Sequence, residues 1–226
     1  MDSKFILYRI LFIIPTVLSL SVHEWAHAYS ASKLGDDTAE RQGRLTLNPL
    51  VHIDPMGTIL LPLLGIPFGW ARPVPVNPTK FTRNVSMRTG MALTAAAGPI
   101  SNFVLAVVCA VLYGLLLRFQ VRLGAQTIPV FLLLGYSIQL NIGLGLFNLL
   151  PVPPLDGSRI AYRFMAHRFP RFWALLERYS RFALIAVFLA GGMILAKPRM
   201  MLERATSSVI VRIAGAHDAA VYDDDP

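Results

Sequence analysis

Residues 89–117 read TGMALTAAAGPISNFVLAVVCAVLYGLLL and contain no Asp, Glu, Lys or Arg. This run is longer than the about 20 apolar residues that an α-helix needs to cross a bilayer. A second uncharged run covers residues 123–155, and a shorter one covers residues 182–196. Of the 226 residues, 54% are hydrophobic and only 15% are charged, whereas about a quarter are charged in soluble domains. The sequence therefore predicts an all-α polytopic membrane protein.

About four transmembrane helices are expected, over residues 5–33, 89–117, 129–150 and 182–196. Between the first two lies a loop, about 44–82, that is rich in Pro and Gly. Its apolar part, residues 58–70, is short and interrupted by prolines, which favours a re-entrant or β-hairpin-like element over a full crossing. The extended run at residues 72–76 could supply an edge strand.

The beginning of the chain has a second interpretation. A basic start followed by an apolar run also resembles a secretory signal peptide, with cleavage near Ser19 to Ser21. The residues that follow this point carry the most informative motif of the chain, and their chemistry argues that the segment is retained.

Basic residues are distributed unevenly along the chain. Segments 33–88 and 157–181 hold 13 of the 21 Lys and Arg residues, which places both segments on the cytoplasmic side by the positive-inside bias. The same bias accounts for the net charge of +8, and no nucleic-acid-binding motif is present, so no nucleic-acid partner is expected. The single cysteine, Cys109, excludes an intrachain disulfide and is expected to be a small buried residue.

Residues 23–27 read His-Glu-Trp-Ala-His, the HExxH pattern of zinc peptidases. On a helix His23 and His27 share one face, so both imidazoles can bind one Zn²⁺, and Glu24 can act as the general base toward water at the metal. Ionisable groups inside an apolar span are costly, which favours a functional interpretation. A polar helix-packing patch and a proton relay are the alternatives.

A catalytic zinc ion needs a third protein ligand. Carboxylates outside the terminal tails and the basic loops are few: Asp36, Asp37, Glu40, Asp54 and Asp156. Asp156 stands out because it follows the end of the third predicted span after a Pro-rich break, although it could instead cap the helix that begins near Ser158. If the 44–82 loop does not cross the membrane, the first and third spans run in the same direction and bring Asp156 to the depth of the two histidines. His52 and Asp54 are interpreted as parts of a loop turn and not as a second metal site.

Several motifs together resemble the site-2 protease family of intramembrane metalloproteases. They are the His23–His27 pattern, the stretch Asn148-Leu-Leu-Pro-Val-Pro-Pro-Leu-Asp156-Gly157, Ala97-Gly98-Pro99-Ile-Ser-Asn102 between them, and Asn48–Pro55 and Trp70–Pro78 in the loop. The resemblance covers most of residues 15–160, in family order. The loop stretches are similar to those of the compact bacterial members without PDZ or CBS domains.

The resemblance implies one Zn²⁺ per chain, with His23, His27 and Asp156 as ligands and Glu24 as the general base. Asn148 corresponds to a family asparagine that holds the substrate backbone or polarises the scissile carbonyl; capping or helix packing is its alternative role. Asn102 carries a weaker assignment. The Gly98-Pro99 pair is expected to let helices approach closely.

The expected function is zinc-dependent endopeptidase activity on single-span membrane-protein substrates, in or near their transmembrane segments, as part of regulated intramembrane proteolysis. A substrate helix would unwind, and its backbone could pair with the edge strand of the loop. The expected location is the bacterial cytoplasmic membrane, with the active site toward the cytoplasm. A zinc- or proton-coupled transporter, and an inactive relative that only binds membrane proteins, are the alternatives.

Two regions are expected. Residues 1–160 form the intramembrane metalloprotease core. Residues 161–226 comprise a basic loop, the fourth span, an amphipathic C-terminal helix that lies at the membrane interface, and an acidic tail.

Overall fold

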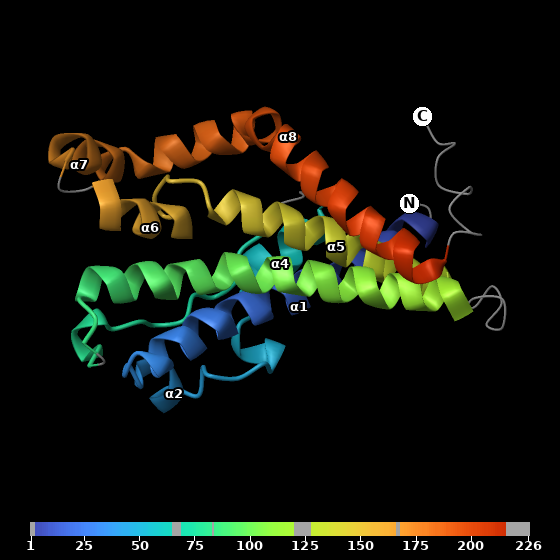
Figure 1. Cartoon of the computed structure of the whole chain (residues 1–226), viewed down its shortest axis with the longest axis horizontal. Helices are drawn as coiled ribbons and strands as arrows, with labels where there is room; N and C mark the ends of the chain where they lie inside the picture. Colours follow the sequence, from blue (N-terminus) through green and yellow to red (C-terminus); the bar gives the residue numbers. More distant parts are fainter. Residues whose placement is uncertain (1–2, 65–68, 83, 120–127, 166–167, 216–226) are drawn as a thin grey trace.

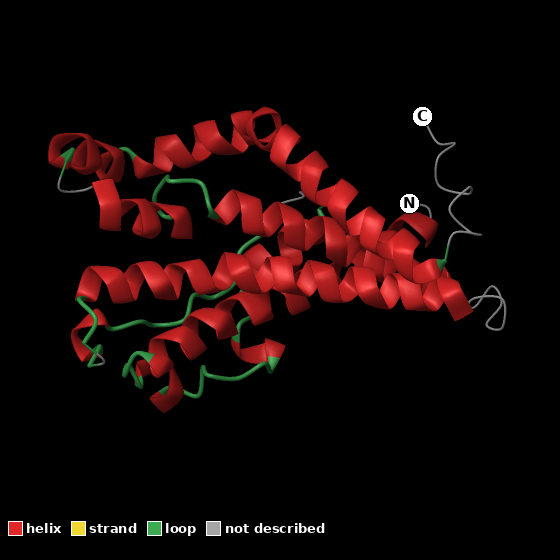
Figure 2. Ribbon diagram, viewed as in Figure 1, coloured by secondary structure: helices red, strands yellow, loops and turns green. Residues whose placement is uncertain are grey.

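The computed structural model describes residues 3–64, 69–82, 84–119, 128–165 and 168–215. Figure 2 shows helices joined by loops over these residues, and no strand occurs among them. The helical elements follow one another in this order: α1 (Ser3–Lys33), α2 (Thr38–Arg41), η1 (Pro49–Val51), η2 (Pro55–Leu60), α3 (Leu61–Leu63), η3 (Pro78–Lys80), α4 (Met87–Phe119), α5 (Ile128–Asn148), α6 (Asp156–Met165), α7 (Pro170–Arg178) and α8 (Ser180–Ala214). The prediction of an all-α fold is confirmed for this part of the chain.

Helix α4 lies at the centre of the bundle and packs against α1, α5, α6 and α8 (Figure 1). The contact with α5 is made by small side chains of α4, Ala106, Cys109 and Ala110, which pack against Ile138 and Ile142. Apolar side chains of α8 complete this cluster. Small residues let helix backbones approach closely, and in a membrane such close packing is a main source of attraction between helices. Cys109 is buried here, as expected.

Three helices in the described residues are long and apolar enough to cross a membrane: α4 (Met87–Phe119), the Pro129–Asn148 part of α5, and α8 (Ser180–Ala214). They correspond to the second, third and fourth predicted spans. Helix α1 runs without a break through Ser19 and Ser21, the positions of the alternative cleavage site, and both serines are buried.

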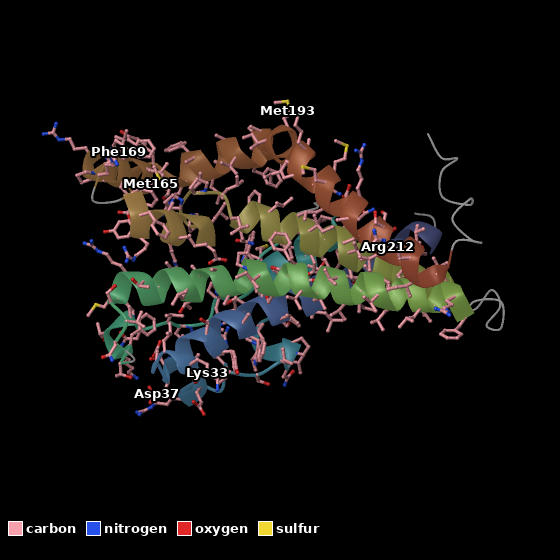
Figure 3. All side chains as sticks on the ribbon, viewed as in Figure 1. Lys33, Asp37, Met165, Phe169, Met193 and Arg212 are labelled. Carbon is pink, nitrogen blue, oxygen red and sulfur yellow. The ribbon has the colours of Figure 1, made fainter. Side chains whose placement is uncertain are left out.

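The end of the fourth predicted span differs from the structure. The sequence predicts a span over 182–196 and a separate interfacial helix after Lys197-Pro198, whereas α8 is one helix of 35 residues that continues through Pro198. Figure 3 shows that α8 bends close to Met193. Pro198 has no N–H to donate to the carbonyl four residues earlier, so it bends the helix near that carbonyl instead of ending it. Beyond the bend, Leu202 and Ile210 pack against the α4–α5 cluster.

Between α1 and α4 the chain folds back on itself, so that residues 70–72 lie beside residues 52–58. The backbone N–H of Arg72 donates to the carbonyl of His52 (2.9 Å), and the hydroxyl of Thr58 donates to the carbonyl of Trp70 (2.8 Å). The expected β-hairpin character is absent from the described part of this segment, whose residues 69–77 are extended without a strand partner. Prolines explain this difference, because Pro73 and Pro75 lack the N–H that a strand ladder requires, and Pro78 directly follows these residues.

Residues 71–82 are held against the C-terminal end of α1. The buried carboxylate of Asp36 accepts a hydrogen bond from the backbone N–H of Asn77 (2.6 Å). Asp37 pairs with Lys80 (2.7 Å) and with Arg41 (2.6 Å). The hydrogen bond from Lys80, assisted by the pair with Arg41, lowers the pKa of Asp37, so this carboxylate is ionised at neutral pH. These contacts hold the extended segment beside the end of α1, and its residue Val74 lines the same cavity as His23 and His27.

The predicted basic loop after the third span is mostly helical, since α6 and α7 occupy much of it. The two short helices meet through the rings of Tyr162 and Trp173, whose centroids lie 5.4 Å apart. Figure 3 shows Lys33 and Phe169 toward one end of the bundle and Arg212 toward the other. Helices α2 and α7 lie toward the first of these ends, away from the chain termini (Figure 1). The predicted acidic tail lies outside the described residues.

Candidate metal centre

Three buried side chains converge at one point between α1 and the start of α6. His23 Nε2 lies 3.0 Å from His27 Nε2, and these two atoms lie 3.1 Å and 3.2 Å from Asp156 Oδ2. The two imidazoles meet because residues four apart share one face of a helix. Asp156, 129 positions further along the chain than His27, is brought to them by the packing of α6 and α5 around α4. The three residues form a possible metal site.

Hydrogen bonds on the far side of each ring orient the imidazoles. His23 Nδ1 lies 2.6 Å from Asn102 Oδ1, and His27 Nδ1 lies 2.7 Å from the carbonyl oxygen of Thr94. Both partners are acceptors, so each ring carries a proton on Nδ1, and a neutral ring then turns the lone pair of Nε2 toward Asp156. Two lone pairs and a carboxylate that face one another in a buried site repel unless a cation lies between them.

The spacing of these three atoms suits zinc. A tetrahedral Zn²⁺ with Zn–N and Zn–O distances of about 2.0–2.1 Å places its ligand atoms about 3.3 Å apart. The observed separations of 3.0–3.2 Å are close to this value. Two imidazoles and one carboxylate also form the ligand set of known catalytic zinc sites, which leave a fourth position open.

Asn102 belongs to a buried polar chain that links three helices. Its Nδ2 donates to Asn141 Oδ1 of α5 (2.7 Å), and Asn141 Nδ2 donates to Ser19 Oγ of α1 (2.8 Å). Asn102 and Asn141 are fully buried, and Ser19 is 1% exposed. The chain fixes the amide so that its oxygen faces His23. Sequence reasoning gave Asn102 little weight and assigned no role to Asn141 or Ser19; buried amides in otherwise apolar spans were the available signal.

Gly98 allows α4 to pass directly behind the two imidazoles. A Cβ atom at this position would lie 2.5 Å from Nε2 and Cε1 of His27 and 2.6 Å from Cε1 of His23. Any larger residue would therefore have to displace the two imidazole rings. The predicted close approach at Gly98-Pro99 is confirmed, and the group that approaches is the pair of histidines.

Glu24 is held beside this cluster by the extended segment. Its Oε2 accepts a hydrogen bond from the backbone N–H of Val74 (2.8 Å), and the carboxylate is buried. The same stretch of backbone is anchored from its other side, since Arg44 Nη2 donates to the carbonyls of Arg72 (2.6 Å) and Pro73 (3.4 Å). This use of Val74 and Arg44 depends on tertiary contacts and has no local sequence signal.

A cavity of about 890 Å³ opens onto the cluster. It lies between α1, α5, α8 and the extended segment, and most of its lining side chains are apolar. Along α1 it runs from Phe12 to His27, which is about 22 Å at 1.5 Å per residue. Asn148 also lines it, while its Nδ2 donates to the carbonyl of Leu144 (3.0 Å) within α5.

The residues excluded as a second metal site are parts of the loop structure. Asp54 Oδ1 accepts hydrogen bonds from the backbone N–H groups of Met56 and Gly57 and so caps η2. The ring of the buried His52 lies with Nε2 2.8 Å from the carbonyl of Thr46. Both contacts agree with the predicted loop turn.

Comparisons with known proteins agree with this geometry. Residues 120–189 match the profile of Peptidase family M50. A Bacillus subtilis (strain 168) protein named "Putative zinc metalloprotease YwhC" is 48% identical over 149 residues, which cover 66% of this chain and 66% of that protein. "Putative zinc metalloprotease Rip2" of Mycolicibacterium smegmatis is 35% identical over 66% of this chain and 54% of its own length. The Mycobacterium tuberculosis (strain H37Rv) protein of the same name is 30% identical over 77% of this chain and 64% of its own length.

The matched stretches thus span between about half and two thirds of the curated relatives. No solved structure matches this chain. The profile match includes Asp156, and the relatives share the name of a zinc metalloprotease. The chain belongs to peptidase family M50, the site-2 protease family.

Proposed function

We propose that this protein is a zinc-dependent intramembrane endopeptidase that hydrolyses peptide bonds in or near the transmembrane segments of membrane-protein substrates. The observation that carries the proposal is the convergence of His23, His27 and Asp156 beside a held carboxylate, Glu24, at the wall of a mostly apolar cavity. A transporter that used the same ligands would need polar groups along a whole pathway, which a mostly apolar lining does not supply.

The proposed roles follow from the contacts of each residue. The two histidines and Asp156 would hold one Zn²⁺ per chain. All three side chains are buried and both imidazole rings are held by hydrogen bonds, so the ligand atoms have little freedom to move. When bound, zinc supplies Lewis-acid chemistry, which polarises a peptide carbonyl and makes water nucleophilic at neutral pH.

Glu24 is the proposed general base. The N–H of Val74 occupies its Oε2, which leaves Oε1 to take a proton from water and return it to the departing amine. The backbone contact keeps the carboxylate next to the ligand pair while the proton is carried. Asn148 lines the same cavity, and we assign it a role in holding the substrate backbone or its carbonyl.

Four membrane spans are proposed, with α1 as the first. Its 31 residues extend for about 46 Å, more than the about 30 Å of a hydrocarbon core. The segment 44–82 is proposed to be re-entrant, and its return to His52 through the N–H of Arg72 supports this. Helices α1 and α5 then run in the same direction, as the joint position of Asp156 and the histidines requires.

The proposed substrates are single-span membrane proteins, cleaved in regulated intramembrane proteolysis at the bacterial cytoplasmic membrane. The cavity runs along α1 for about 22 Å and is lined mostly by apolar side chains, which suits an apolar segment. A helix hides its carbonyls, so the substrate would unwind beside the cluster. If it pairs with residues 71–76, it uses backbone groups other than the N–H of Val74, which Glu24 already occupies.

The basic segments support an active site toward the cytoplasm. Helix α2 lies in the first of these segments and α7 in the second, and both are found toward the same end of the bundle (Figure 1). Excess Lys and Arg mark cytoplasmic loops. Asp156 precedes the second of these segments directly.

Metal analysis combined with a cleavage assay tests the proposal. Purified wild-type protein should contain one zinc ion per chain and cleave a single-span model substrate in a bilayer. The Glu24→Gln variant should keep its zinc and lose cleavage, because an amide cannot accept the proton. Glu40→Gln, which changes an exposed carboxylate of α2, is the matched control and should cleave like wild type. Wild-type protein without zinc, or cleavage retained by Glu24→Gln, would contradict the proposal.

A further inference from the structure

Besides the two histidines, the lining of the cavity contains four acidic or basic side chains: Glu24, Asp156, Arg159 and Arg199. Three of them have partners. Glu24 accepts from Val74, Asp156 faces the two imidazoles, and Arg199 pairs with Glu203 at 2.7 Å. Within the part of the chain that the structure describes, Arg159 makes no hydrogen bond or ion pair. Arg159 is exposed and lines the cavity.

The position of Arg159 follows from its helix. It lies three residues after Asp156 in α6, one turn farther along the helix, and side chains three apart are neighbours with Cβ atoms about 5–6 Å apart. Helix α6 runs toward the end of the bundle where α7 lies (Figure 1). The neighbouring arginine of the same helix is already used, because Arg163 donates to Thr89 of α4 (2.7 Å). Arg159 therefore lies beside the candidate metal site formed by His23, His27 and Asp156, and the five N–H donors of its guanidinium are available.

An unpaired arginine in such a place selects for an anion. While the cavity holds water, the guanidinium is solvated; when an apolar chain fills the cavity, the water leaves and an unpartnered charge becomes costly. A carboxylate removes this cost, since the planar guanidinium binds it with two parallel hydrogen bonds. A chain segment that brings a carboxylate to Arg159 would bind better than one that brings a neutral amide.

We propose that Arg159 forms a carboxylate-binding subsite that selects substrates with an acidic group close to the scissile bond, on its cytoplasmic side. This inference rests on the proposed function for its substrate and its orientation. An extended substrate advances about 3.3 Å per residue. Arg159, whose Cβ lies about 5–6 Å from that of Asp156, is therefore displaced from the metal site by about two substrate residues. The carboxylate is that of an Asp or Glu side chain or of a free chain terminus.

A binding experiment tests this subsite without requiring cleavage. Full-length Glu24→Gln protein in neutral-lipid nanodiscs is titrated with single-span peptides that carry Asp, or in the matched series Asn, at each successive position across the cytoplasmic end of the segment. At one or two adjacent positions the Asp peptide should bind about tenfold more tightly than the Asn peptide, a factor that corresponds to about 1.4 kcal/mol. Adding Arg159→Gln should remove this preference, and adding Arg159→Glu should transfer it to peptides that carry Lys.

Two further arms complete the test. Adding Arg171→Gln, which changes an exposed arginine of α7 outside the cavity lining, is the matched control and should leave the preference intact. Peptides that end at the preferred position, with a free or an amidated terminus, separate a terminal carboxylate from an acidic side chain. The inference is overturned if no position shows a preference for Asp, or if Arg159→Gln keeps it.

The two proposals fail in distinguishable ways. Selective binding through Arg159 without cleavage by the wild-type protein would contradict the protease assignment and leave the subsite in place. Cleavage by the wild-type protein at equal rates for Asp and Asn peptides, with equal affinities, would leave the protease assignment in place and remove the subsite.

Discussion

Replacing Gly98 by alanine should disable the metal centre while leaving the helix bundle folded. The new Cβ would lie 2.5 Å from the imidazole of His27, whereas ordinary van der Waals contact begins at 3.4 Å. The rings, or α4 as a whole, must therefore move by about 0.9 Å. Metal–ligand distances tolerate only about 0.2 Å. Changes to the shell that orients ligands cost about 10–100-fold in metal affinity, and we expect a loss at the upper end of this range.

The same substitution should not destabilise helix α4 itself. Alanine is favoured over glycine inside a helix by about 1 kcal/mol, so the variant should insert and purify normally. Zinc affinity, measured by competition with a chelator, should fall by about 100-fold, and peptide cleavage should fall with it. Gly135→Ala on α5 is the matched control, because the nearest heavy atom to its Cβ would be 4.0 Å away. Zinc affinity of Gly98→Ala within twofold of wild type would refute the proposed packing of α4 behind the histidines.

Three further predictions concern the neighbours of the site and its orientation. Asn102→Leu should weaken zinc binding by about 10–100-fold in the same competition assay, because the imidazole of His23 loses its hydrogen-bond acceptor. Unchanged affinity would show that Asn102 does not orient His23 for zinc binding. Val74→Pro should lower kcat by about tenfold or more at full zinc content, since the lost hydrogen bond to a charged group is worth about 1.5–3 kcal/mol; a steady-state assay with metal analysis would expose an unchanged kcat. In a Cys109→Ala background, Phe169→Cys should react with a membrane-impermeant maleimide from the cytoplasmic face only; labelling from the opposite face would invert the proposed orientation.

Predictions from the sequence succeeded where the physical cause is local. The HExxH spacing places His23 and His27 on one helix face through the 3.6-residue period, and uncharged runs mark helices able to cross a bilayer. The predicted end of the fourth span at Pro198 was wrong. A proline weakens a helix locally, whereas the packing of Leu202 and Ile210 on α4 and α5 stabilises α8 beyond it. The prediction also failed for the β-hairpin character of the 44–82 loop, which is absent from the residues of this loop that the structure describes, because prolines remove N–H groups that pairing needs.

The sequence alone determined that the chain is helical and apolar enough for a membrane, and it pointed to two imidazoles on one helix face with a carboxylate after the third predicted span. Only the tertiary structure decided that Asp156 meets those imidazoles, that Asn102 and Thr94 turn them toward it, and that the backbone N–H of Val74 holds Glu24. The physical reason is range: helix periodicity and hydropathy act between residues a few positions apart. The two imidazoles of α1 and the carboxylate of α6 meet, with the rings oriented by α4, only once α1, α4 and α6 have packed together.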